Sequence, residues 1–305
     1  MLKNYKIMDK PPLDINLSLI EFYDSAIENQ DDSEDVSIVD ELASIDERYD
    51  KEEKIASGGM KNIIRSHDRM TDRIVAKGVI RHDESHESLD KFIEEVRITA
   101  SLEHPNIIPI YDLGLTTEKT PFFTMKLIEG DDLQVVLDRL NSKDLETLAY
   151  FDQSQMLEIF LKVCDAIEYA HSKNVLHLDI KPANIQVGQF GEVLVCDWGL
   201  ARNLKNLKVT SESVSQSVEE GINLTMDGQT KGAPAFMAPE QISSDVGPRS
   251  TRTDAYVLGS LLYHLLTLNL PIEGELIVEI LKKTYSGDIE DVNTRNEDVK
   301  IPTAL

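Results

Sequence analysis

One short stretch in the middle of the chain brings several oxygen-bearing side chains together. Asp179 and Asn184 lie in a polar loop, and Asp197 directly follows the apolar residues 193–196. The segment that joins them, residues 185–196, is typical of a tight hairpin with glycines in its turn. The three side chains must therefore lie close together whatever the rest of the chain does. The sequence predicts a compact polar site at this hairpin.

The residue types at this site suit phosphoryl transfer, which needs metal ions, a clamp on the phosphates and a carboxylate beside the attacking hydroxyl. Asp179 could orient a hydroxyl and accept its proton, and Lys181 could direct its ammonium at the transferred phosphate. Asn184 and Asp197 offer the oxygen ligands that Mg²⁺ prefers. We therefore predict Asp179 and Lys181 as catalytic residues, with Asn184 and Asp197 as metal ligands.

Four motifs in this part of the chain resemble those of protein kinases. Residues 177–184 read HLDIKPAN and are similar to the H-R-D-x-x-x-x-N catalytic loop, and residues 197–199 (DWG) resemble the D-F-G element. Residues 232–241 (GAPAFMAPEQ) resemble the A-P-E segment, and residues 253–259 the helix whose Asp anchors the catalytic loop. The chain thus resembles eukaryotic-type (Hanks-type) serine/threonine kinases of the bacterial branch. The resemblance implies an α+β fold of two lobes, a small β-rich lobe and a mainly helical large lobe.

The resemblance also implies ATP and Mg²⁺ as cofactors and a set of nucleotide-binding positions. Lys77 is placed like the phosphate-binding lysine, and Glu95 like its ion-pair partner. Met125 resembles the residue at the back of the adenine pocket, Ile128 would offer hinge hydrogen bonds, and Asp132 could meet a ribose hydroxyl. The implied positions are Ile55, Gly58, Gly59, Ile63, Val75, Lys77, Glu95, Met125, Ile128, Asp132 and Gln186.

Hydrophobic periodicity divides the chain into three parts. Residues 1–48 form an acidic extension, either a solvated tail with transient helices or a docking or autoinhibitory segment. The small lobe spans residues 49–128, with strands at 54–64, 72–80, 107–113 and 121–128 and a helix at 88–102. The large lobe spans residues 129–305, with helices at 132–140, 153–172, 239–242 and 253–267, strands at 185–187 and 193–196, and a mobile activation loop at 200–237.

Charge and composition limit the partners that we expect. The 55 acidic and 31 basic side chains give a net charge of −24, which argues against binding to nucleic acid or anionic membranes. The most apolar run, residues 256–270, is too short to span a bilayer, and no signal peptide is visible, so we expect a cytoplasmic protein. Cys164 and Cys196 lie in apolar stretches and are predicted to be buried, reduced thiols.

Two departures from the kinase pattern affect the expected activity. In the glycine-rich loop Ala56 and Lys61 replace the outer glycines, so we expect weaker nucleotide clamping, although Lys61 could add positive charge near the phosphates. Leu178 replaces the arginine that receives an activation-loop phosphate, which defines a non-RD type. We therefore expect activation without loop phosphorylation. Self-phosphorylation within residues 203–231 and an unmodified loop both stay open.

The end of the chain resembles the approach to the final helices of the large lobe. Those helices, and the arginine that pairs with Glu240, are not among the 305 residues. We expect a C-terminally truncated kinase, or a gap that a partner chain or the N-terminal extension covers.

The main hypothesis is an ATP-dependent kinase that phosphorylates Ser or Thr hydroxyls of proteins. A catalytically weak or inactive pseudokinase, acting as a binding or scaffold module, is the alternative. A kinase for small molecules fits the fold but not the well-matched A-P-E region.

Overall fold

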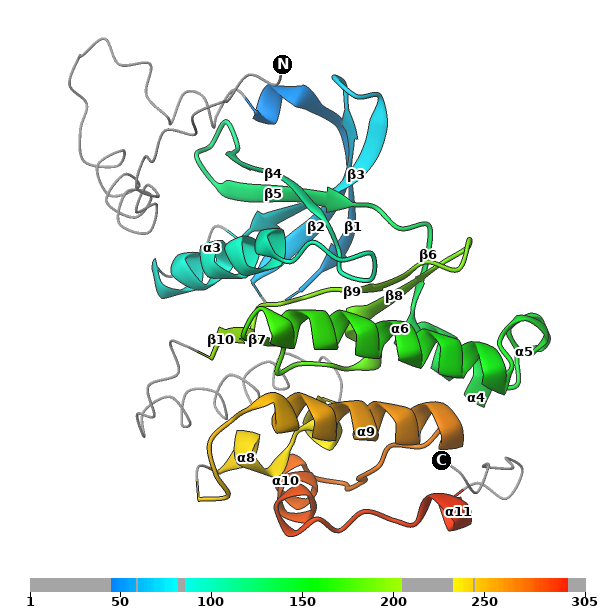
Figure 1. The fold of residues 1–305 in the computed structure, drawn as a ribbon. Helices are drawn as coiled ribbons and strands as arrows, with labels where there is room; N and C mark the ends of the chain where they lie inside the picture. The colour runs from blue at the N-terminus through cyan, green and yellow to red at the C-terminus, as the bar shows by residue number, and fades with distance from the viewer. Residues whose placement is uncertain (1–44, 59, 82–85, 205–232, 244, 296–305) are drawn as a thin grey trace, which may run out of the picture.

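The computed structural model describes residues 45–58, 60–81, 86–204, 233–243 and 245–295. Within these ranges the chain forms two lobes, a β-sheet with one helix and a mainly helical body (Figure 1). The predicted α+β, two-lobed fold is therefore confirmed. The N-terminal extension up to residue 44 and residues 205–232 of the predicted activation loop lie outside the described residues.

A five-stranded antiparallel sheet forms the small lobe, in the order β1-β2-β3-β5-β4. The region 54–64, predicted as strands around a turn, contains the end of one strand and the start of the next, because the Gly58 amide donates to the Lys61 carbonyl at 2.9 Å and turns the chain. The strands are β1 (Tyr49–Ser57), β2 (Lys61–Asp68), β3 (Arg73–Ile80), β4 (Ile110–Leu115) and β5 (Pro121–Lys126).

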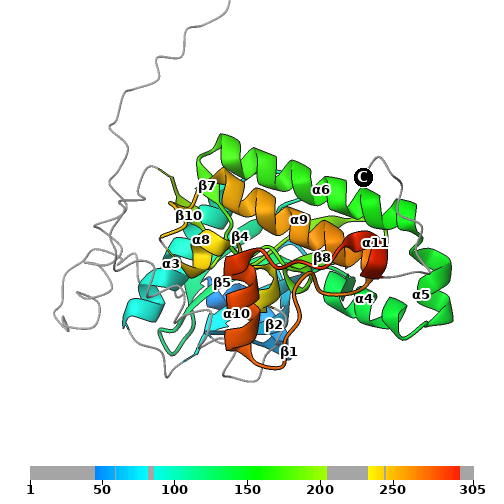
Figure 2. The same ribbon diagram turned by 90° about the horizontal axis from the view of Figure 1, so that it is seen from below.

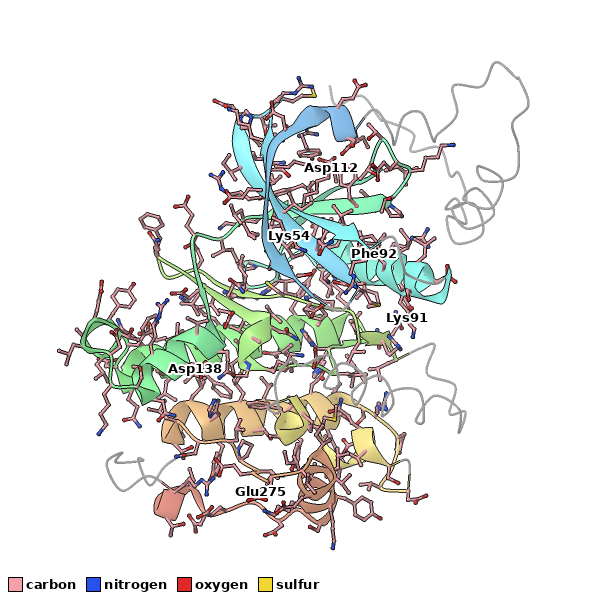
Figure 3. The ribbon with its side chains drawn as sticks, turned by 180° about the vertical axis from the view of Figure 1, so that it is seen from behind. Lys54, Lys91, Phe92, Asp112, Asp138 and Glu275 are labelled. Carbon is pink, nitrogen blue, oxygen red and sulfur yellow. The ribbon has the colours of Figure 1, made fainter. Side chains whose placement is uncertain are left out.

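The two faces of this sheet have different neighbours, because successive side chains of a strand point to opposite faces. On the inner face, helix α3 (His86–Ser101) packs Phe92 and Val96 against Ile80 and Phe123 (Figure 3). The outer face carries a second apolar cluster, made by Tyr49, Val75 and Phe122. A residue's place in the alternation therefore decides whether it faces α3 or the opposite side.

An ionic network joins the segment before β1 to strands β2 and β4 of the small lobe. Arg48, at the end of the short helix η1 (Asp46–Arg48), binds the buried carboxylate of Asp68 through two hydrogen bonds of 2.6 Å. Arg48 also reaches Asp112 on β4 at 3.2 Å, and the Tyr49 hydroxyl donates to Asp112 at 2.6 Å (Figure 3). The domain boundary predicted after residue 48 falls inside this network.

Replacing Asp68 with alanine is expected to lower the free energy of unfolding by about 2–3 kcal/mol, since Arg48 and the turn amides lose a charged acceptor. The hydrogen bonds from Arg48 hold the pKa of Asp68 below its ordinary value. This stabilisation is therefore present above the unfolded pKa of about 3.9 and is lost as the pH falls through the lower folded pKa. Urea unfolding at neutral pH and near pH 3 should show the difference between the two proteins shrinking in acid.

The matched control is Asp131→Ala, because Asp131 also pairs with an arginine, Arg139 at 2.6 Å, but at the surface. That exposed pair should contribute less than about 1 kcal/mol. If the two variants lost the same free energy of unfolding, the buried carboxylate of Asp68 would not stabilise the fold more than an exposed one.

The large lobe is built on two long antiparallel helices that lie side by side, α6 and α9 (Figures 1 and 2). The small sheet β6-β8-β9 lies between them and the upper lobe. The helices are α4 (Leu133–Asn141), α5 (Leu145–Tyr150), α6 (Gln153–Ser172), α8 (Pro239–Ile242), α9 (Thr251–Thr267), α10 (Ile277–Ser286) and α11 (Val292–Arg295). The strands are β6 (Gly130–Asp132), β7 (Val175–Leu176), β8 (Ile185–Gly188), β9 (Val193–Val195) and β10 (Arg202–Asn203).

Most predicted elements of this lobe are confirmed, and the bounds of α6 and α8 agree to the residue. Helix α6 begins sharply because Asp152 and Gln155 form a reciprocal capping box. Helices α5, α10 and α11 were not predicted. Cys164 and Cys196 are free thiols, as predicted, but both are half-buried rather than buried. Among the described helices, none has both the length and the hydropathy that a membrane span requires.

Candidate active site

The predicted catalytic loop is held in place from below by a buried carboxylate. Asp254, in the first turn of α9, is fully buried and accepts hydrogen bonds from the backbone amides of His177 (3.0 Å) and Leu178 (2.9 Å). It also bonds the imidazole of His171 at 2.7 Å. The prediction that Asp254 anchors the loop is confirmed. Both amides precede Asp179 directly, so Asp254 fixes the backbone that carries this residue.

Asp179, Lys181 and Asn184 form one hydrogen-bonded group. The Asn184 amide donates to the Asp179 carbonyl at 2.8 Å and to its Oδ2 at 2.9 Å, and the Lys181 ammonium donates to the same Oδ2 at 2.8 Å. Burial alone would lower the pKa of Lys181, but the Asp179 carboxylate raises it above its ordinary value. The second oxygen of Asp179, Oδ1, is then the atom that can accept a proton from a hydroxyl.

Asp197 stands two residues after the end of β9, and its side chain is exposed. Its side chain is 45% exposed, whereas the next residue, Trp198, is buried against the His177 ring at a centroid distance of 4.5 Å. Trp198 thus packs in the core and fixes the chain directly after Asp197. The nearby positive charge of Lys61 lowers the pKa of Asp197, with a smaller contribution from Lys181.

The donor set fits a magnesium ion that is shared with phosphates. Asp197 offers a carboxylate, and Asn184 offers its amide oxygen because its amide nitrogen already serves Asp179. Mg²⁺ commonly takes one or two protein oxygens and completes its shell with phosphates and water. In the described ranges no group of three or more His, Cys, Asp or Glu side chains could hold a metal ion by itself.

The predicted ion pair between Lys77 and Glu95 is wrong. Lys77 lies on the outer face of β3, where its ammonium donates to Asp46 and, at 2.7 Å, to Glu52. The ammonium also sits 4.3 Å from the centroid of the Phe122 ring. The physical reason is the alternation of side chains along a strand: α3, which carries Glu95, covers the other face.

Glu95 pairs instead with Lys61, which the resemblance placed in the glycine-rich loop. The Lys61 ammonium donates to Glu95 Oε1 and, at 3.2 Å, to Asp197 Oδ1. Burial alone would lower the pKa of Lys61, but Asp197 and Glu95 together hold it above its ordinary value. Burial raises the pKa of Glu95, and the positive charge of Lys61 opposes that change. The site therefore has a lysine next to Asp197, but it comes from β2.

Strand alternation also separates the positions predicted around the adenine ring. Val75 packs on the outer face with Tyr49 and Phe122, so its predicted place in the nucleotide site is wrong. Met125 packs with the inner cluster, and Ala76 lies directly opposite it in the sheet. Ala76, which was not among the predicted nucleotide-binding positions, therefore lies on the inner face beside Met125.

The remaining predicted positions lie around the junction of the two lobes. Ile128 lies in the link between β5 and β6, and Gln186 on β8 pairs with Asp132 on β6. The Asp132 carboxylate caps α4 by accepting from the Val135 amide at 3.0 Å. On the β1–β2 hairpin Ile55 is exposed, Ile63 is half-buried and Gly58 forms the turn, while Gly59 lies outside the described residues. Their contacts with a nucleotide stay predictions.

Comparison with known proteins supports the family indicated by this geometry. The family model "Protein kinase domain" matches residues 49–304. The chain is 35% identical over 259 residues to serine/threonine-protein kinase PknD of Protochlamydia amoebophila, covering 82% of this chain and 26% of that protein. It is 37% identical over 237 residues to PknD of Chlamydia pneumoniae, covering 74% of this chain and 24% of that protein. The chain thus spans about a quarter of the length of these relatives.

Proposed function

The chain belongs to the protein kinase family, and from this premise we propose that it transfers the γ-phosphate of ATP to Ser or Thr hydroxyls of proteins. Asp179 carries the proposal. Its carboxylate is held by Lys181 and Asn184, and the loop that bears it is tied to Asp254. Phosphoryl transfer depends mainly on such fixed positioning and on charge stabilisation.

The roles of the individual side chains follow from their contacts. Asp179 orients the acceptor hydroxyl and takes its proton, and Lys181 stays close enough to balance charge at the transferred phosphoryl. Asn184 and Asp197 would hold Mg²⁺, which supplies charge neutralisation between the phosphates when it is bound. Asn184 links the metal site to the catalytic base, since its amide nitrogen donates a hydrogen bond to Asp179.

The direct test is transfer of label from γ-labelled ATP to the chain itself or to a generic acceptor protein, with Mg²⁺ and after its removal by a chelator. Incorporation that depends on Mg²⁺ and resists acid but not alkali would mark phosphoserine or phosphothreonine. No incorporation into either acceptor would contradict the proposal.

One observation favours the rival function, a pseudokinase that binds without turnover. Lys77, the lysine of β3, points away from α3. The next residue of β3, at the position that faces α3, is Gly78, which has no side chain. A thermal-shift titration with ATP, with and without Mg²⁺, separates the two functions when it is read beside the transfer assay. A Mg²⁺-dependent shift without label transfer would favour the pseudokinase.

Activity is expected to survive phosphatase treatment, changing by less than about twofold, because residue 178 cannot receive a loop phosphate. Leu178 is buried, its amide bonds Asp254, and its carbonyl accepts from Gln241 at 2.8 Å. The measurement is transfer to an external acceptor before and after dephosphorylation, with complete removal of phosphate checked by mass spectrometry. Loss of activity that rephosphorylation restores would contradict this expectation.

A further inference from the structure

We propose that Lys61, on β2, is the lysine that binds the phosphates of ATP, and that Lys77 is a structural lysine of the outer face. The inference rests on the proposed kinase function and specifies its phosphate site. Four observations carry it: the two faces of β3, the space beside Gly78, the contacts of Lys61 and the contacts of Lys77.

The register of the sheet excludes a phosphate-binding side chain from β3. Gly78 lies directly opposite Phe123 of β5, on the face that α3 covers. A Cβ atom at position 78 would lie 2.7 Å from Cζ of Phe123, so any side chain there must displace the ring. The inner face of β3 at this point is thus filled by an aromatic ring from the neighbouring strand.

Lys61 reaches the same region from the strand next to β3. It pairs with Ile80 in the β2–β3 register, and directly paired residues share a face, so Lys61 also points to the inner side. Its ammonium passes 5.7 Å from the centroid of the Phe123 ring and ends between Glu95 and Asp197. Lys61 therefore places its charge beside the predicted metal ligand.

The position of Lys61 in the hairpin also suits contact with phosphates. Lys61 follows the turn at once, and its carbonyl accepts from the Gly58 amide at 2.9 Å. Its side chain is 18% exposed, and its ammonium pairs with the buried carboxylate of Glu95 and with the half-exposed carboxylate of Asp197. A lysine that a buried carboxylate holds in place beside a solvent-exposed metal ligand suits contact with phosphates that share that metal.

Lys77, by contrast, has a complete set of partners. Its side chain is 2% exposed, its ammonium donates to Asp46 and Glu52, and the Phe122 ring lies beneath it. Asp46 belongs to η1, and Glu52 lies on β1, the edge strand of the sheet. Lys77 therefore ties η1 and β1 to the outer face of β3.

A matched pair of substitutions tests the assignment. Lys61→Met is expected to lower kcat/KM for ATP about 100-fold and to shrink the thermal shift produced by Mg²⁺ and ATP. Lys77→Met should keep kcat/KM within about threefold of the wild type but lower the midpoint of thermal unfolding, because it leaves two carboxylates without their cation. A folded Lys77→Met protein with the larger catalytic loss would overturn the proposal, as would unchanged ATP kinetics in Lys61→Met.

A chemical readout covers the case in which either variant fails to fold. An acyl-phosphate derivative of ATP acylates the amine that lies beside its phosphates: the amine nitrogen bonds the acyl carbon, the nucleotide phosphate leaves and the amine loses a proton. Applied to the wild-type chain and followed by peptide mass spectrometry, this probe should label Lys61, and excess Mg²⁺ and ATP should suppress the labelling. Labelling that omits Lys61 would overturn the assignment.

The two tests also separate this inference from the proposed function. Label on Lys61 in a chain that transfers no phosphate would refute kinase activity and leave the lysine assignment standing. Phosphate transfer by a chain in which the probe marks Lys77 but not Lys61 would refute the lysine assignment and leave kinase activity standing.

Discussion

Replacing Asp179 with asparagine is expected to lower the rate of phosphoryl transfer about 1,000-fold, because an amide cannot accept the proton of the attacking hydroxyl. The fold should be retained, since the Asn oxygen can still accept from Lys181 and Asn184 as the Asp179 Oδ2 atom does. The measurement is the initial rate of label transfer at saturating ATP, together with the thermal shift produced by Mg²⁺ and ATP. The transfer rate should fall, while the thermal shift should equal that of the wild type.

The matched control is Asp138→Asn, because Asp138 is an exposed carboxylate on α4 (Figure 3) whose bonded partner is the neighbouring Gln134 at 2.9 Å. That variant should transfer phosphate at the wild-type rate. Undiminished transfer by Asp179→Asn would refute the assignment of the base. An equal loss of the thermal shift would show that the residue serves nucleotide binding instead.

Replacing Asp254 with alanine is expected to abolish measurable transfer and to lower the free energy of unfolding by about 3–4 kcal/mol. The physical reason is the loss of one buried acceptor that serves three donors at once, the amides of His177 and Leu178 and the ring of His171. Urea unfolding followed by fluorescence of the single tryptophan gives the stability change, and Trp198 is a local reporter since it packs on His177.

Asp138→Ala provides the baseline for this prediction, with an expected loss below about 0.5 kcal/mol at an exposed site. A folded Asp254→Ala protein that transfers phosphate at the wild-type rate would show that the catalytic loop holds its shape without the anchor. If Asp254→Ala lost no more stability than Asp138→Ala, the predicted loss in the free energy of unfolding would be contradicted.

The catalytic loop could be predicted from the sequence because its parts are near neighbours along the chain. Asp179, Lys181 and Asn184 lie within six residues, and a short hairpin delivers Asp197 to them. Local geometry alone then brings the groups together, and the structure confirms the contacts among the first three. The long helix α6 could be predicted for a similar reason, since its apolar period and its capping box are both local.

The lysine that pairs with Glu95 could not be predicted in the same way, because its identity depends on the strand register. Motif comparison matched Val75-Ala76-Lys77, but a shift of one residue along a strand reverses the face. The signal that could have found Lys61 was present: Ala76, Gly78 and Ile80 alternate as small or apolar residues of one face. That alternation leaves Lys77 on the other face.

The ligands of Lys77 also show where the folding unit begins. Sequence similarity to the family starts at Tyr49, yet Asp46 binds Lys77 and Arg48 binds Asp68 from just before that point. A protein that began at Tyr49 would keep every kinase motif but lose the contacts of Asp46 and Arg48 with the sheet. The family match therefore begins a few residues after the start of the segment that stabilises the small lobe. A protein made for expression should begin before Asp46.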